Sequence, residues 1–204
     1  MIYIRILLFL LGSLIYALGI SVTIKVQHLG IHPWDVLNVG LYNKLGLSIG
    51  TWNIIVGAIL ITTSLILDRT YVKVGSLFSA IIIGIFVDFY LWIDILPSAT
   101  HSWIDIITIL VGIAIMGVGG GMYNAAQIGS GPRDGFMLSI SDKLNVSIGR
   151  IRIITETIVL LIGLFIGGPV FVFTFVFTFI QSPIFQVTYL KLLNYMNRIE
   201  RRMQ

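Results

Sequence analysis

Long intervals with few charged residues constrain this chain more than any other feature of its sequence. A helix needs roughly 20 predominantly apolar residues to cross the hydrocarbon core of a bilayer, which is about 30 Å thick. Six intervals approach that length, at about residues 6–24, 50–67, 74–93, 105–126, 150–167 and 170–190. They predict an all-α membrane protein with six transmembrane helices and the lipid bilayer as its main partner.

Composition supports lipid as the solvent of the folded chain. Hydrophobic residues make up 57% of the 204 residues and charged residues only 11%, whereas average proteins have about 25% charged residues. The net charge of +4 indicates cytoplasmic anchoring rather than nucleic-acid binding, because Lys and Arg cluster between apolar runs and at the C-terminus. The chain has no Cys and only three scattered His residues, so we expect neither a metal site nor a cofactor.

The N-terminal residues imitate a signal peptide, with Arg5 followed by an apolar run. That run continues to Ile24, and no small-residue cleavage site follows it. We therefore expect a retained first helix, and residues 1–204 to form a single membrane domain.

The distribution of basic residues orients the predicted helices, because Lys and Arg accumulate in cytoplasmic loops. If the N-terminus is inside and all six helices cross, the outside receives only Lys25 and Lys44 of the 13 basic residues. We therefore expect a multi-pass protein of the cell membrane with both termini in the cytoplasm.

An internal repeat is the most informative feature for architecture. Six residues recur 99 positions later: Pro33, Asp35, Leu45, Ser48, Ile49 and Gly50 reappear as Pro132, Asp134, Leu144, Ser147, Ile148 and Gly149. A unit of three crossings inverts in the membrane when it is duplicated. We therefore expect two inverted three-helix repeats, at about 1–98 and 101–190, followed by a basic amphipathic tail at 191–204.

Each repeat contains a Gly/Pro-broken segment followed by a short helix. The first break includes Gly30 and Pro33, and the second includes Gly129, Gly131 and Pro132. The short helices either re-enter the membrane or lie at its surface. Inverted repeats with broken segments at corresponding positions are typical of secondary transporters.

The paired Gly-x-x-Pro-x-Asp breaks, each followed by Leu-x-x-Ser-Ile-Gly, resemble those of the YczE/YyaS/YitT-type family of bacterial membrane proteins. Arg152-x-x-x-Glu156, leading into a Gly-Gly-Pro turn at 167–169, adds to a resemblance that covers nearly the whole chain. The resemblance implies a small polytopic protein of the bacterial inner membrane, without an assigned activity or substrate. The chain departs from the family pattern at His32 and Arg133.

Asp35 and Asp134 fall in the first turns of the two short helices, two residues after a Pro suited to the first helical position. One interpretation is structural, because acids in a first turn cap free N–H groups and interact favourably with the helix dipole. The other is that the two helix starts face a cavity and bind an anionic group there. Since the positions repeat, we expect equivalent roles for the two residues.

Glu156 lies one to two turns inside the fifth predicted helix. An ionisable residue inside a membrane costs about 2.5–3.5 kcal/mol on insertion scales and marks a candidate functional site. It either forms an ion pair with Arg152, one turn away, or binds a proton or ligand. In both cases we expect it to face protein rather than lipid.

Further polar residues, Asn124 and Gln127, follow at the end of the fourth predicted helix. They either line the same cavity or form hydrogen bonds between helices. Small residues at four-residue spacing predict close helix packing, namely Ser76, Ala80 and Gly84 on the third helix and Gly117, Gly121 and Ala125 on the fourth.

Two functional hypotheses remain. The first is a small secondary transporter or permease, with a small-molecule or ion substrate bound between the repeats. The second is a non-transporting scaffold or regulator that binds another membrane protein, a biosynthetic complex or a second copy of itself. An enzyme is not expected, because the sequence offers no nucleophile–base pair. A central polar cavity reaching Glu156 and both Asp residues would favour the first hypothesis, and a dry core the second.

The expected topology can be tested by cysteine labelling, because the natural chain has no Cys. A Cys introduced at Ser98 should react with an impermeant thiol reagent from outside the cell. A Cys at Ser141 should react only after the membrane is permeabilised. The opposite labelling pattern would contradict the inverted arrangement.

Overall fold

The computed structural model describes residues 2–71, 73–93 and 95–203. Within these ranges the chain forms eight α-helices and two short 3-10 helices, and no strand. The α-helices are α1 (Ile2–Lys25), α2 (Pro33–Leu45), α3 (Ile49–Leu67), α4 (Val74–Trp92), α5 (Trp103–Ala125), α6 (Pro132–Leu144), α7 (Ile148–Phe165) and α8 (Val172–Met203). The 3-10 helices are η1 (Gln27–Leu29) and η2 (Arg69–Tyr71). The predicted all-helical fold is confirmed.

Five of these helices are long and apolar enough to cross a membrane: α1, α3, α4, α5 and α8. The sixth predicted crossing corresponds to α7, which has 18 residues and carries Arg150, Arg152 and Glu156. Because three of its 18 residues are charged, α7 is not apolar enough to be grouped with these five helices. The chain is thus a helical membrane protein with several apolar spans.

Local sequence signals explain where the short helices begin. Pro33 and Pro132 each occupy the first turn of their helix, α2 and α6, where a missing N–H costs no hydrogen bond. Gly30 lies between η1 and α2 with a φ of 97°, a conformation that favours glycine. Gly129 and Gly131 lie in the loop between α5 and α6.

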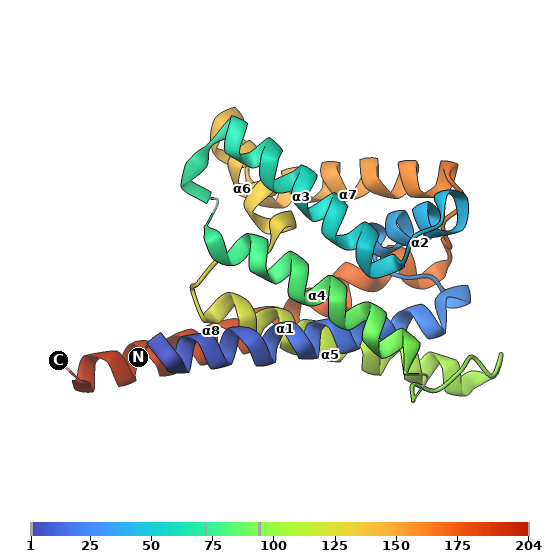
Figure 1. Cartoon of the computed structure of the whole chain (residues 1–204), viewed down its shortest axis with the longest axis horizontal. Helices are drawn as coiled ribbons and strands as arrows, with labels where there is room; N and C mark the ends of the chain where they lie inside the picture. The colour runs from blue at the N-terminus through green and yellow to red at the C-terminus, as the bar shows by residue number, and fades with distance from the viewer. Residues whose placement is uncertain (1, 72, 94, 204) are drawn as a thin grey trace.

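The helices form two layers (Figure 1). Helices α1, α5 and α8 lie side by side in one layer, while α3 and α7 lie in the other with the short helices α2 and α6. Helix α4 packs on both α1 and α3 and so joins the layers. Both chain ends lie at one end of the molecule; α6 lies toward that end and α2 toward the opposite one.

Glycines on α1 and α5 allow these two antiparallel helices to pack at backbone distance. At four glycines, a Cβ would lie too close to an atom of the partner helix. The contacts join Gly12 with Tyr123, Gly19 with Met116, Gly112 with Thr23 and Gly119 with Tyr16. In lipid, where no hydrophobic force drives helices together, such close approach supplies much of the packing energy.

The small residues that were predicted to serve packing do so. A Cβ at Gly84 on α4 would contact Ile54 and Gly50 of α3. On another face of α5, Gly117 and Gly121 lie against α8 in the same way. Helix α5 therefore packs closely against α1 on one face and against α8 on another.

The C-terminal segment differs from the prediction of a helix ending near residue 190 and a separate tail. Helix α8 continues to Met203 through Pro183, a length of 32 residues. At about 1.5 Å per residue it exceeds the roughly 30 Å hydrocarbon core. The Arg5 guanidinium lies 3.0 Å from the Glu200 carboxylate and ties the end of α8 to the start of α1.

The α1–α5 contact leads to a stability prediction. Changing Gly119→Ala places a methyl group against the backbone of Tyr16 and should lower the free energy of unfolding by about 1–3 kcal/mol through overpacking. Gly149→Ala is the matched control, because nothing lies within 4 Å of its Cβ position. Thermal unfolding of the two purified variants in detergent measures the difference. Equal melting temperatures would show that this contact does not hold the helices together.

Candidate functional site

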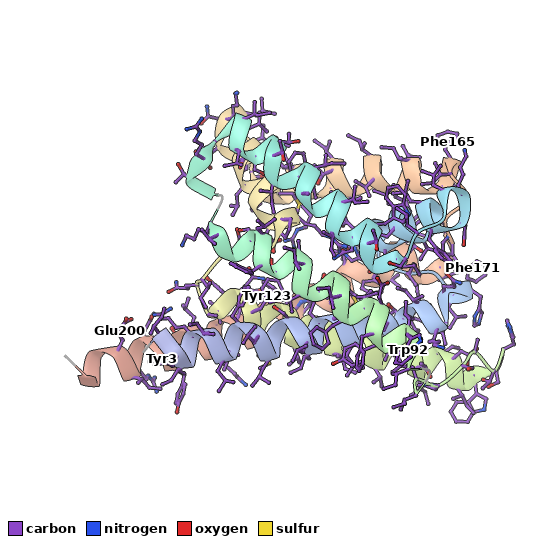
Figure 2. The ribbon with its side chains drawn as sticks, in the orientation of Figure 1. Tyr3, Trp92, Tyr123, Phe165, Phe171 and Glu200 are labelled. Atoms are coloured by element: carbon purple, nitrogen blue, oxygen red, sulfur yellow. The ribbon has the colours of Figure 1, made fainter. Side chains whose placement is uncertain are left out.

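A cavity of about 90 Å³ lies inside the bundle, where the two short helices begin. Its charged lining residues are Arg133, Asp134, Arg152 and Glu156. Since a water molecule occupies about 30 Å³ in the liquid, the cavity has room for a few waters or one small solute. Tyr123 of α5, labelled in Figure 2, lies between the two layers and forms part of the wall.

Arg133, at the start of α6, pairs with Asp35 at the start of α2. Its Nη2 donates to the Asp35 carboxylate at 3.0 Å and to the Asn53 side-chain oxygen at 3.1 Å. The guanidinium carbon lies 5.5 Å from the centre of the Trp34 ring, within the range of a cation–π contact. The side chain of Asp35 is only 1% exposed and that of Arg133 16%. The first turns of the two short helices are therefore joined by a buried ion pair.

Asp134 pairs with a different arginine. The Nη2 atom of Arg152, on α7, lies 3.3 Å from the Asp134 carboxylate. Both side chains are more accessible than the first pair, at 35% and 26% exposed. The two arginines of the cavity thus each have one carboxylate partner.

Glu156, on α7, accepts a hydrogen bond from the Thr178 hydroxyl of α8 at 3.0 Å. Its other carboxylate oxygen lies 4.0 Å from Nε2 of His32. The side chain is 15% exposed and lines the cavity, so it faces protein as expected. The arginine one turn away, Arg152, contacts Asp134 instead.

The orientation of His32 follows from its role at the start of α2. Its Nδ1 accepts a hydrogen bond from the Trp34 N–H at 3.4 Å and caps the helix. A neutral imidazole that accepts at Nδ1 carries its hydrogen at Nε2. His32 therefore presents an N–H group toward the Glu156 carboxylate.

The predicted capping role of the two acids is not what the structure shows. The N-cap of α2 is His32 and that of α6 is Gly131, whereas Asp35 and Asp134 each face an arginine. For Asp35 the physical reason is burial, because a carboxylate that is only 1% exposed needs a charged partner; Asp134 pairs with Arg152 at a more open position.

Two other predicted site residues do not line the cavity themselves, although Asn124 lies within hydrogen-bonding reach of Asp134 and Tyr123, which do. Asn124 donates to the Gly120 carbonyl within its own helix at 3.0 Å. Gln127 accepts from Arg5 at 3.0 Å. Neither is among the cavity-lining residues, nor are Asp35, Gly30, Pro33 and Gly129, whereas Gly131 and Pro132 are.

Several residues of the cavity were not predicted as site residues, above all Arg133, His32, Asn53 and Thr178. Arg133 and His32 carried a usable signal, because each adjoins the Pro of a break. Asn53 and Thr178 look like ordinary polar residues of apolar helices, and only the packing of α3 and α8 brings them to the cavity.

Metal ligation has no support in the described part of the chain, where no group of three or more His, Asp or Glu side chains is arranged to hold an ion. The arrangement can instead hold a small polar solute and exchange a proton. With each arginine facing one acid, Glu156 is the third acidic group near the cavity, and its contacts, with Thr178 and His32, are to groups that can be neutral.

Comparison with known proteins identifies relatives over most of the chain. A sequence model described as "Family of unknown function (DUF6198)" matches residues 3–190. Over 159 residues, the chain is 35% identical to "Uncharacterized membrane protein YczE" of Bacillus subtilis, covering 78% of this chain and 73% of that protein. It is 32% identical over 161 residues to "Uncharacterized protein YyaS" of the same bacterium, covering 78% and 80%. No solved structure matches. The resemblance to YczE-type and YyaS-type membrane proteins is thereby confirmed.

The two ion pairs predict losses of stability of very different size when their arginines are replaced. Arg133→Gln should lower the free energy of unfolding by about 3–5 kcal/mol, because it leaves the buried Asp35 carboxylate unpaired. Adding Asp35→Asn should restore most of that loss. Arg152→Gln should cost only about 0–1 kcal/mol, since its pair with Asp134 is partly solvated. Thermal or denaturant unfolding in detergent compares the variants, and equal costs for the two arginines would contradict the difference in burial.

Proposed function

The chain belongs to the DUF6198 family, whose function is unknown, and we propose that it is a secondary transporter that moves a small solute across the cell membrane. The observation that carries this proposal is the cavity lined by four charged side chains inside a bundle of apolar helices. Charged groups inside a membrane protein are costly and commonly mark a pathway for substrates or ions. The cavity reaches Glu156 and Asp134 but not Asp35, which contacts it only through Arg133; its presence favours a transporter over a scaffold, for which we expected a dry core.

The transporter crosses the membrane six times, with α7 as the remaining span. The exposed side chains of α7 after its first turn are apolar apart from Thr157: Ile153, Ile154, Ile158, Leu161, Ile162, Leu164 and Phe165. Its Arg152 and Glu156 line the cavity instead. Phe165, the last residue of α7, lies at the same end of the molecule as Trp92 and Phe171 (Figure 2). Trp92 is the last residue of α4, and Phe171 comes directly before α8. An amphipathic helix placed in this way suits a crossing with one face toward lipid.

The two halves of the chain form inverted repeats. Support comes from the packing of α1 on α5, in which each contact has a counterpart 100 positions away. The contact of Gly12 with Tyr123 corresponds to that of Gly112 with Thr23, because positions 12 and 112 and positions 23 and 123 are each 100 residues apart. The Gly19–Met116 and Gly119–Tyr16 contacts correspond in the same way. Reciprocal contacts of this kind are expected of a two-fold axis between halves. Similarly, α2 packs on α7 as α6 packs on α3.

The binding site lies between the repeats, where secondary transporters hold their substrates. Residues at the 99-residue spacing converge on the same cavity in five pairs: His32 with Gly131, Trp34 with Arg133, Asn53 with Arg152, Gly57 with Glu156 and Ile83 with Ser182. Three of these pairs have an arginine or a glutamate, and each of these charged residues belongs to the second repeat. The cavity therefore has a symmetric frame and an asymmetric charge distribution.

Glu156 exchanges a proton during the transport cycle. The ionisable groups that line the cavity with it are Arg152 on its own helix, Arg133 and Asp134 on α6, and His32 before α2. Tyr16 and Tyr123 complete the set. Both arginines are engaged by other carboxylates. A proton is therefore the simplest means of neutralising Glu156 when the cavity is closed to water. The role requires no chemical step, and we propose no enzymatic activity.

Reconstitution into liposomes containing a pH-sensitive dye tests this function. A panel of small anions, cations and neutral solutes is added in turn, with protein-free liposomes as the control for passive leakage. At least one solute should drive proton movement through the natural protein. Glu156→Gln retains an acceptor for the Thr178 hydroxyl and should remain folded, but its solute-driven proton flux should fall to the protein-free level. Glu200→Gln, outside the cavity, should retain the flux. If no solute moves protons, or if the Glu156 variant transports them normally, the proposal fails.

A further inference from the structure

We propose that the cavity binds an oxyanion group of its solute, a small carboxylate or an inorganic oxyanion, through Nη1 of Arg133. The identification of this anion as the transported solute rests on the proposed function, whereas its binding does not. The inference starts from the hydrogen bonds that Arg133 makes and those that it leaves unmade.

Only one of the two terminal nitrogens of Arg133 is engaged. Nη2 donates to Asp35 and Asn53. Nη1 is buried, and no residue that the structure describes accepts a hydrogen bond from it. A buried N–H group without an acceptor is unfavourable, and this guanidinium lines the cavity. An acceptor bound in the cavity would satisfy it.

The Arg133–Asp35 pair is not the closed arrangement expected of a purely structural ion pair. Arginine and carboxylate often pair through two parallel hydrogen bonds. Here only Oδ1 of Asp35 is used, and Oδ2 is buried without a partner among the described residues. The single contact fixes the guanidinium and leaves Nη1 buried without an acceptor among the described residues. Asp35 is thus a positioning residue for Arg133.

The neighbours of Arg133 hold it in place before any ligand arrives. Trp34 lies against its face at 5.5 Å and is itself 3% exposed, while Asn53 of α3 contacts the edge. Because the side chain is already ordered, little conformational entropy is lost on binding. A planar guanidinium held in this way matches the geometry of an oxyanion.

The surroundings favour an anion over a cation. Arg152 lines the same cavity, and α6 begins there with Gly131 and Pro132. None of the described side chains caps α6, whose first turn contains Asp134, and the partial positive charge of its N-terminus lies in the same region. A cation held by Glu156 would leave Nη1 of Arg133 without an acceptor.

Charge balance links the anion to the proton on Glu156. Arg133 and Arg152 stand against Asp35, Asp134 and Glu156, which gives a formal charge of minus one when all five are ionised. A proton on Glu156 neutralises the site, and a bound monoanion restores the original charge. Loading the solute together with a proton therefore leaves the formal charge of the site unchanged, whereas loading the anion alone would make it more negative.

The experiment measures ligand-induced thermal stabilisation of the purified full chain in detergent. The probes are sodium acetate, lactate, nitrate and phosphate, each titrated against sodium chloride at matched ionic strength, with ammonium chloride and choline chloride as cation probes. At least one oxyanion should raise the unfolding temperature in a saturable manner. Saturation by carboxylates alone identifies an organic acid as the solute, and saturation by nitrate or phosphate an inorganic anion.

Matched variants separate the site from general salt effects. Arg133→Gln combined with Asp35→Asn keeps the charge balance and avoids an unpaired buried acid, and it should abolish the saturable shift. Arg150→Gln removes one basic charge at an exposed position of α7 and should leave the shift intact. Stabilisation that persists in the double variant, stabilisation by cations alone, or no saturable shift with any probe would overturn the inference. Saturable oxyanion binding without any liposome flux would instead refute the transporter and leave the anion site standing.

Discussion

The need to satisfy backbone polar groups away from water is the constraint on which this structure depends. In lipid, an interrupted helix is tolerated only where protein or a cavity covers the break. Gly30, in the break before α2, lies against Thr174 of α8, and Ile31 beside it is fully buried. Gly129, in the break before α6, lies against Ser76 of α4. Each break is thus covered by a helix of the other half of the chain, which interlocks the two halves around the cavity.

The same burial determines how the charged residues behave. A carboxylate removed from water needs a partner, and the covered breaks bring together the first turns of α2 and α6 at Asp35 and Arg133. The resulting pair is buried, whereas the Arg152–Asp134 pair is partly open. The two acids are therefore equivalent in having an arginine partner and unequal in their exposure. The Arg133–Asp35 pair is therefore the buried side of the site, and the Arg152–Asp134 pair is the side closer to solvent.

Helix α7 has exposed apolar side chains and also charged side chains that line the cavity. Its outer face carries exposed Ile, Leu and Phe side chains, while Arg152 and Glu156 reach the cavity. The corresponding positions on α3 are Asn53 and Gly57, so the first half supplies polar or small groups where the second supplies charge.

The sequence by itself determined the helical class, the apolar spans, the short helices and the positions of the breaks. These depend on local properties: runs of apolar residues, Pro at a first turn and Gly at a positive φ. It also predicted that Glu156 faces protein. Only the tertiary structure decided the partners of the charged residues. Arg152 faces Asp134 rather than Glu156, and Arg133 reaches Asp35 across 98 residues, because such contacts depend on which helix faces lie together. The end of α8 was likewise decided by its contacts, since Arg5 binds Glu200 beyond the point where the apolar pattern stops.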